Sequence, residues 1–88
     1  MKDTACEFFK ALGHPLRIKI VKELYDGPTC VCHINDNIES SQANISKHLR
    51  ILKNGNVLSC KKIGMYTYYS LTDEKIKDVV KIVEEMMK

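Results

Sequence analysis

The segment that decides the fold reads Ser40-Ser-Gln-Ala-Asn-Ile-Ser-Lys-His-Leu-Arg-Ile-Leu-Lys-Asn-Gly-Asn-Val57. Three branched apolar side chains in it recur at helical spacing and predict one buried helix face. They are Ile45, Leu49 and Leu52. Ser41 is a typical N-cap and Gly55 a typical C-terminal stop. We therefore predict an amphipathic helix over residues 41–53.

The predicted outer face of this helix carries short polar groups and cations. Its members are Gln42, Asn44, Ser46, Lys47, His48 and Arg50. Gln and Asn side chains read adenine edges, Lys reads guanine, and Ser holds phosphates. The only acid nearby is Glu39. This composition favours contact with duplex DNA over an ordinary solvated helix face.

Helical patterns also precede this segment. A helix over about residues 4–12 opens with a capping-box pattern at Thr4, and a second helix starts at Pro15 and ends before Gly27. Residues 29–39 carry a weaker signal for a short helix. The region before residue 40 therefore predicts two helices and a short third one.

The only strand signal lies in residues 57–71, in two runs that turn at Gly64. A last amphipathic helix opens at Thr72 and ends near Met87. The predicted order is α-α-α-α-β-β-α, mainly α with a small β-hairpin, which is the order of a winged helix-turn-helix. Lys61 and Lys62, near the hairpin turn, are placed to bind a phosphate backbone.

Length and composition narrow the class of protein. The chain has 88 residues, of which 44% are hydrophobic and 28% charged, with a net charge of +3. These values predict one globular domain over residues 1–88 and exclude a multi-domain enzyme or a repeat array. No apolar run is long enough for a bilayer and no signal-peptide pattern appears, so we expect a cytoplasmic protein.

The chain contains four cysteines, Cys6, Cys30, Cys32 and Cys60. We expect them to be reduced, because a bond between Cys30 and Cys32 would close a very small ring. On a regular helix, residues two apart point in nearly opposite directions, whereas in an extended segment they face the same way. The pair therefore predicts a ligand site only if the short helix loosens there. Thiolates select As(III), Sb(III), Cd(II), Pb(II), Zn(II) or Cu(I).

Several motifs together are similar to the ArsR/SmtB family of metal- and stress-responsive repressors. They are residues 42–57, the Ala-Leu-Gly-His-Pro-Leu-Arg stretch at 11–17, Tyr68-Tyr-Ser-Leu71 and the Cys-Val-Cys box at 30–32. The resemblance implies a non-enzymatic, homodimeric repressor that pairs through its first and last helices. It also implies binding to an imperfect palindrome in double-stranded DNA and release when an inducer binds.

The same resemblance implies a soft-metal or metalloid inducer at the Cys-Val-Cys box, with no permanently bound cofactor. Two thiolates are rarely enough, so a third ligand is needed. Cys6 is the better candidate, since N-terminal cysteines reach the box across the dimer in the cadmium- and lead-sensing branch. Cys60 is the second candidate. The family's other metal site, on the last helix, is not expected, because Lys75 stands where a His is needed.

A thiol redox or persulfide regulator with the same fold is the alternative function. It needs two cysteines far enough apart to bridge, such as Cys6 with Cys30 or Cys32. A thiol oxidoreductase is disfavoured because the chain lacks a Cys-x-x-Cys motif. A metal carrier that never contacts DNA is the remaining alternative.

Overall fold

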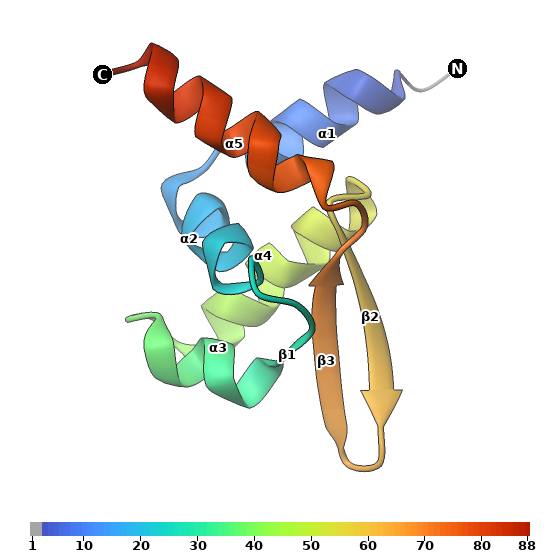
Figure 1. Cartoon of the computed structure of the whole chain (residues 1–88). Helices are drawn as coiled ribbons and strands as arrows, with labels where there is room; N and C mark the ends of the chain where they lie inside the picture. Colours follow the sequence, from blue (N-terminus) through green and yellow to red (C-terminus); the bar gives the residue numbers. More distant parts are fainter. Residues whose placement is uncertain (1–2) are drawn as a thin grey trace.

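The computed structural model describes residues 3–88 and shows helices gathered around a small antiparallel sheet (Figure 1). In chain order the elements are α1 (Thr4–Leu12), α2 (Pro15–Glu23), β1 (Thr29–Cys30), α3 (Val31–Asn37), α4 (Gln42–Asn54), β2 (Leu58–Ile63), β3 (Tyr66–Leu71) and α5 (Lys75–Met86). Helices α1 and α5 lie at one end of the molecule, and α3 and the tip of the β2–β3 hairpin lie at the other. This arrangement confirms the predicted winged helix-turn-helix, and we call the β2–β3 hairpin the wing.

The sheet contains one strand more than the sequence predicted. Strand β1 pairs with the wing strand β3, with Thr29 opposite Tyr69 and Cys30 opposite Tyr68. The sheet order is therefore β1-β3-β2. A strand of two residues is too short to show the alternation of apolar and polar side chains that predicts a strand, so it could not be predicted from the sequence. Its consequence is that the cysteine box begins on the sheet that carries the wing.

The buried core lies between the helices and the inner face of the sheet. Its least exposed large side chains are Ile20, Val21, Leu24, Ile34, Ile45, Leu49, Leu52, Val57 and Leu58. The three predicted apolar positions of α4 are among them, so the prediction from helical spacing is confirmed. Helix α5 adds Ile76 and Val80 to this core. Among residues 3–88, no helix is both long and apolar enough to cross a bilayer.

Helix α1 spans residues 4–12 as predicted, but its N-cap and the start of α5 differ from the prediction. The N-cap of α1 is Asp3, whose carboxylate accepts from the backbone N–H of Cys6, and not Thr4. Helix α5 begins at Lys75, because the Asp73 carboxylate accepts from the Lys75 backbone N–H. The N-cap of α4 is Ser41, as predicted, and its hydroxyl accepts from the backbone N–H of Asn44.

Helix α4 ends at a glycine that is required for packing. Gly55 has φ −86°, an ordinary value for any residue, and the left-handed residue is Asn56 with φ 62°. A Cβ atom on Gly55 would lie 2.5 Å from the Ala11 side chain and 3.2 Å from the Glu7 carbonyl oxygen. Gly55 therefore allows α1 to cross directly over the end of α4.

Replacing Gly55 by alanine is expected to destabilise the protein by about 1–3 kcal/mol, because the added methyl group overpacks the α1–α4 contact. Urea unfolding followed by circular dichroism measures this change. Asn56→Gly is the matched control, because glycine adopts the positive φ of residue 56 without strain. This substitution is expected to leave the free energy of unfolding unchanged or slightly higher. Equal stability of Gly55→Ala and the wild type would contradict the packing role.

Candidate nucleic-acid interface and cysteine pair

The outward side of α4 presents a continuous polar surface. Gln42, Ser46, Lys47 and Arg50 are exposed, as predicted. Ala43 and Lys53 are also exposed on this helix and were not among the predicted DNA contacts. Their spacing from Ser46, Lys47 and Arg50 was the available signal, because residues three and four apart share a helix face. A small apolar side chain such as Ala43 also suits a thymine methyl group.

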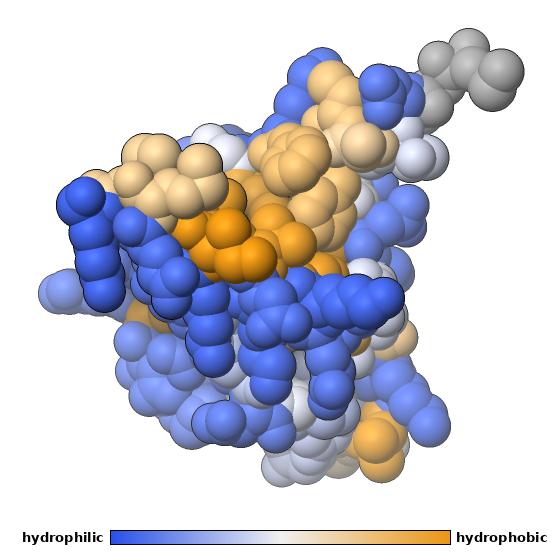
Figure 2. Space-filling model, turned by 45° about the horizontal axis from the view of Figure 1, so that its top comes forward, coloured by the Kyte–Doolittle hydropathy of each residue, from blue (hydrophilic) through white to orange (hydrophobic). Residues whose placement is uncertain are grey.

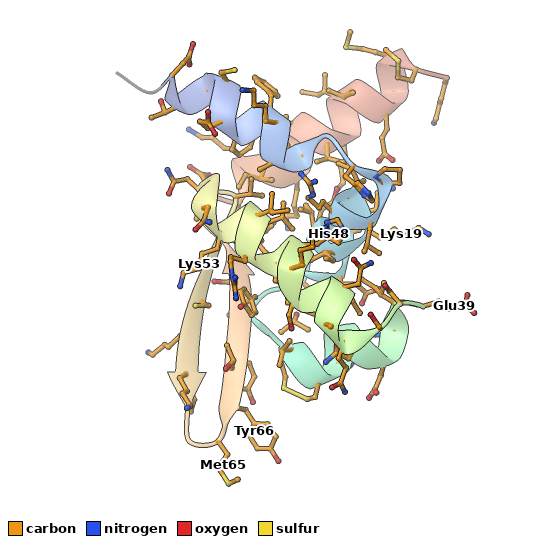
Figure 3. All side chains as sticks on the ribbon, turned by 180° about the vertical axis from the view of Figure 1, so that it is seen from behind. Lys19, Glu39, His48, Lys53, Met65 and Tyr66 are labelled. Atoms are coloured by element: carbon orange, nitrogen blue, oxygen red, sulfur yellow. A yellow bond between two sulfur atoms is a disulfide. The ribbon has the colours of Figure 1, made fainter. Side chains whose placement is uncertain are left out.

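Two residues predicted to contact DNA have other partners. The Asn44 side chain is half-buried, and its amide nitrogen donates to the Ser40 hydroxyl at 2.9 Å. His48 is only 6% exposed, so its side chain packs inside the protein and does not face outward as expected for a DNA contact. Figure 3 shows His48 on the inner side of α4, turned toward the neighbouring helices. Its position three residues after Ile45 lies at the edge of the buried stripe.

His48 belongs to a polar junction that joins three helices. Its Nδ1 accepts a hydrogen bond from Arg17 Nε at 3.1 Å, and Arg17 Nη1 donates to the Lys10 and Ala11 carbonyls at the end of α1. The His14 ring, which caps α2, lies 4.6 Å from the His48 ring, centre to centre. This junction explains why the 11–17 motif contains His14 and Arg17: they hold α1 and α2 against α4.

The junction predicts a pH dependence of stability. Burial, together with the neighbouring positive charges of His14, Arg17 and Lys47, lowers the pKa of His48 below 6.5. The unfolded chain then binds a proton more readily than the folded one. The contribution of neutral His48 to the free energy of unfolding is therefore complete above about pH 6.5. It is lost as the pH falls through the lowered pKa of His48 in the folded chain.

Urea unfolding of wild type and His48→Gln at several pH values between 7.5 and 5 tests this expectation. The difference in unfolding free energy between the two is expected to shrink as the pH falls. His33→Gln, at an exposed histidine outside this junction, serves as the control for a histidine-to-glutamine substitution. Parallel curves for wild type and His48→Gln would contradict the account.

The two wing lysines lie on opposite faces of the hairpin. Lys62 is paired with Thr67, and this face continues through Cys60 and Tyr69 toward the core. Lys61 is paired with Tyr68 on the outer face. Both lysines are exposed. Lys62 therefore shares its side of the wing with α4, while Lys61 projects from the other side.

Tyr69 links the inner face of the wing to the end of α4. Burial raises the pKa of the Tyr69 hydroxyl, the neighbouring Cys60 adds to the rise, and the charges of Lys53 and Arg50 oppose it. Figure 3 shows Lys53 beside the hairpin. The cations of α4 and the wing thus form one basic region.

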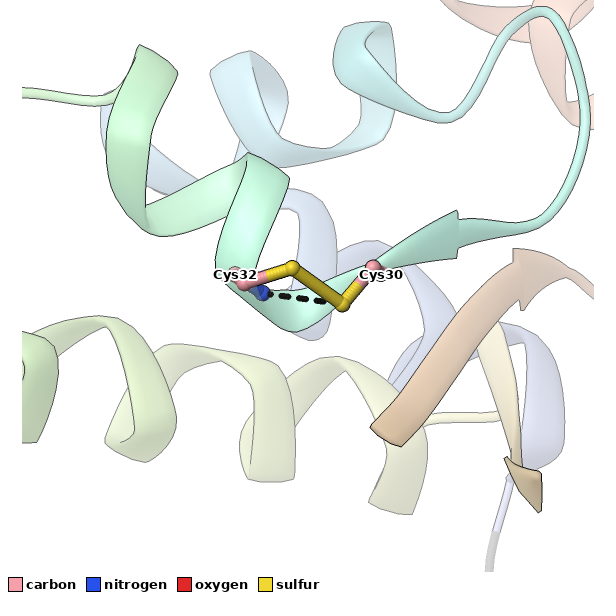
Figure 4. The surroundings of a disulfide bond; sticks show 2 residues. All are labelled: Cys30 and Cys32. Atoms are coloured by element: carbon pink, nitrogen blue, oxygen red, sulfur yellow. Dashed lines mark hydrogen bonds between the residues drawn. A yellow bond between two sulfur atoms is a disulfide. The ribbon is translucent and has the colours of Figure 1, made fainter. Parts of the chain in front are cut away.

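Cys30 and Cys32 bring their sulfur atoms together at the start of α3 (Figure 4). The structure joins them in a disulfide, with the two Cα atoms 5.3 Å apart, so the expectation of reduced thiols is not met in this state. Cys30 has an extended backbone and is the N-cap of α3, and its sulfur accepts from the Cys32 backbone N–H at 3.3 Å. Since only Cys32 lies in the helix, the sulfurs meet without any loosening of α3.

The other two cysteines lie apart from this pair within one chain. Cys6 is exposed in the first turn of α1, and Cys60 is half-buried opposite Tyr69. Tyr69 is opposite Thr29, while Cys30 is opposite Tyr68, so Cys60 and Cys30 lie on different faces of the sheet. Among residues 3–88 of a single chain, no group of three His, Cys, Asp or Glu side chains is placed to hold a metal ion.

Comparison with known proteins identifies the family. The model of the family described as "Bacterial regulatory protein, arsR family" matches residues 14–59, which include α2, α3, α4 and the start of the wing. The chain belongs to this family. The family and the fold are those of transcriptional regulators, not of enzymes.

Three relatives of this ArsR-family chain are similar over most of its length. It is 39% identical over 85 residues to the uncharacterized HTH-type transcriptional regulator MJ1325 of Methanocaldococcus jannaschii, and the match covers 96% of each protein. It is 47% identical over 73 residues to a CadC homolog of Staphylococcus aureus, a cadmium resistance transcriptional regulatory protein, covering 82% of this chain and 60% of that protein. It is 37% identical over 73 residues to the arsenical resistance operon repressor of Bacillus subtilis, covering 82% of this chain and 70% of that protein.

A solved structure supports the fold. The homodimeric winged helix-turn-helix DNA-binding domain of Mb0332 from Mycobacterium bovis superposes with a TM-score of 0.86 and 24% identity, covering 97% of this chain and 79% of that one. The family match and the similar repressors together show that the chain is a DNA-binding transcriptional repressor of the ArsR/SmtB type.

Proposed function

We propose that this ArsR-family chain forms a cytoplasmic homodimer that binds an imperfect palindromic operator and releases it when a soft metal ion or metalloid binds reduced Cys30 and Cys32. The candidate inducers are As(III), Sb(III), Cd(II), Pb(II) and Zn(II). The observation that carries the proposal is the convergence of the two sulfur atoms at the N-terminus of α3. Two sulfurs that lie within bonding distance are also close enough to bind one ion once they are reduced.

The position of the pair supports coupling between inducer and DNA. Cys30 lies on β1, which pairs with the wing strand β3, and Cys32 lies in the first turn of α3. Helix α3 packs against β3 and leads into α4 through residues 38–41. An ion that draws the two sulfurs into its own geometry therefore acts on both DNA-contacting elements. The relatives named for cadmium and arsenical resistance support release as the direction of the effect.

Dimerisation is supported by the apolar surface over α1 and α5 (Figure 2). Its large exposed side chains are Phe9, Ile82, Val83, Met86 and Met87. Two of them, Phe9 and Val83, border an apolar groove of about 280 Å³. Leu12, Ile18 and Val79 also line this groove. A two-fold axis through this surface would pair the two faces and place the α4 helices on successive turns of DNA. The homodimeric state of Mb0332 is in keeping with this arrangement.

The third ligand is expected from the second subunit. Cys6 is exposed on α1, which the proposed dimer brings to its interface. Cys60 is less suited, because it lies on the face of the sheet opposite to Cys30. The resemblance to the cadmium- and lead-sensing branch supports Cys6 of one subunit as the ligand that reaches across the dimer to the pair in the other.

A thiol redox regulator is the second candidate function. The observation that favours it is the disulfide between Cys30 and Cys32, which replaces the longer bridges that we expected from the sequence. In this case hydrogen peroxide would oxidise the two thiols: the S–S bond forms as the O–O bond breaks, and the two thiol protons leave with the peroxide oxygens as two water molecules. The disulfide would then change operator affinity without any metal.

Titration of reduced dimer with each metal, followed by the ultraviolet thiolate-to-metal charge-transfer band, tests the metal site directly. We expect a saturable band with Cd(II) or As(III) that is absent from the oxidised protein. If mild peroxide alters operator affinity and no metal produces the band, the redox function replaces the metal function.

A further inference from the structure

The large exposed apolar side chains of residues 3–88 form two separate groups. Five of them lie on α1, on α5 and at the C-cap of α5, where the proposed dimer covers them. The other three are Ile63, Met65 and Tyr66 at the tip of the wing, which are 54%, 91% and 57% exposed. The wing tip lies at the end of the molecule opposite to α1 and α5, so the same dimer does not cover it (Figures 1 and 3).

The tip is a tight turn rather than a loose loop. Gly64 has φ 61°, and Met65, the next residue, has a negative φ. Glycine with positive φ at the first central position is typical of a two-residue type II′ hairpin turn. Ile63 and Tyr66 face each other as the last cross-strand pair. Met65 is therefore held at the end of a narrow, well-paired hairpin, and Figure 3 shows it pointing away from the protein.

The surroundings of this apolar tip are suited to nucleic acid. Lys61 and Lys62 lie directly behind it, and residues 58–71 contain no acidic side chain. Strands of six residues extend about 20 Å, close to the half-turn of about 17 Å that separates neighbouring grooves of one duplex. The minor groove is about 6 Å wide, too narrow for a helix but accessible to a two-residue turn.

Resting on the proposed operator binding, we propose that the wing tip enters the minor groove beside the major groove bound by α4, with Met65 as an apolar wedge. Apolar side chains inserted there unstack a base step and bend the duplex toward the major groove. Pyrimidine–purine steps unstack at the lowest cost, so the wing favours operators that carry such a step at that position. The specificity of the wing then comes from DNA deformability, while Lys61 and Lys62 supply charge.

The test compares wild type with Met65→Ser, Met65→Leu and Lys62→Ala on a duplex selected by the wild type from a randomised library. Fluorescence anisotropy at several salt concentrations gives affinity and its salt dependence, and energy transfer between end-labels gives the bend. Met65→Ser is expected to bind at least about tenfold more weakly, with an unchanged salt slope and a smaller bend. Met65→Leu is expected to retain both properties.

Lys62→Ala provides the contrast, because it removes a phosphate contact and is expected to flatten the logarithmic salt slope by about 0.9. If Met65→Ser binds and bends the duplex like the wild type, the wedge is overturned while operator binding by α4 stands. Loss of binding to anionic lipid vesicles in Met65→Ser, with DNA binding unchanged, also overturns it and assigns the tip to a membrane surface. A wild type that selects no duplex overturns both the wedge and the proposed function.

Discussion

Replacing both Cys30 and Cys32 by serine is expected to leave operator affinity within about twofold of the wild type and to abolish the response to metal. The wild-type dimer, kept reduced, is expected to lose about 5- to 150-fold in affinity when Cd(II) or As(III) is added, the usual range of allosteric coupling. Serine is a suitable replacement because the Cys30 sulfur caps α3 by accepting from the Cys32 backbone N–H. A serine hydroxyl serves the same capping role, so α3 is expected to persist.

Fluorescence anisotropy of a labelled operator, with and without metal, measures the effect. Cys60→Ser is the matched control and is expected to keep most of the response, because Cys60 lies on the other face of the sheet from Cys30. Cys6→Ser is expected to weaken the response if the second subunit supplies the third thiolate. Full metal-induced release in the double variant would place the inducer site elsewhere.

Replacing Lys47 and Arg50 together by alanine is expected to reduce operator affinity by about 10²- to 10³-fold. Both side chains are exposed on the outward face of α4 and neither is needed for the core. Loss of a good base contact costs about 1–3 kcal/mol, and loss of a phosphate contact also lowers the salt dependence. Anisotropy with the selected operator at two salt concentrations separates these contributions.

Lys75→Ala is the control for charge. Lys75 is also exposed but is the first residue of α5, which lies at the other end of the molecule from α3 and the wing tip. It is expected to change operator affinity less than about threefold, in line with a distant surface charge. If Lys75→Ala weakens operator binding as much as the combined replacement of Lys47 and Arg50 does, non-specific charge accounts for the affinity. Helix α4 is then not the element that reads the base sequence.

The fold was predictable where apolar residues recur at a clear helical period and typical capping residues mark both helix ends. Helix α4 follows from the spacing of its three apolar residues, from Ser41 and from the Asn54-Gly55 pair. The short strand β1 was not predictable, because its two residues are extended only through pairing with β3. Gly55 illustrates a related limit: the sequence marks it as a helix stop, whereas the structure requires it for the close approach of α1.

The candidate site was predictable in part. The exposed polar positions of α4 follow from the helical period, but that period alone does not say which boundary residue turns inward. His48 turns inward because Arg17, far away in the sequence, donates to it. The cysteine pair was identified from its resemblance to the Cys-Val-Cys box of the family. Its geometry depends on Cys30 lying just outside α3, and helix ends are the least certain part of a sequence-based prediction.

One titration tests directly whether thiolate chemistry at Cys30 and Cys32 controls the affinity for operator DNA. Reduced protein bound to labelled operator is titrated with Cd(II), and anisotropy and thiolate-to-metal absorbance are recorded in the same cuvette. We expect both signals to change together and to saturate at the same metal-to-protein ratio. Absorbance that saturates while the anisotropy of the bound operator stays constant would contradict this expectation.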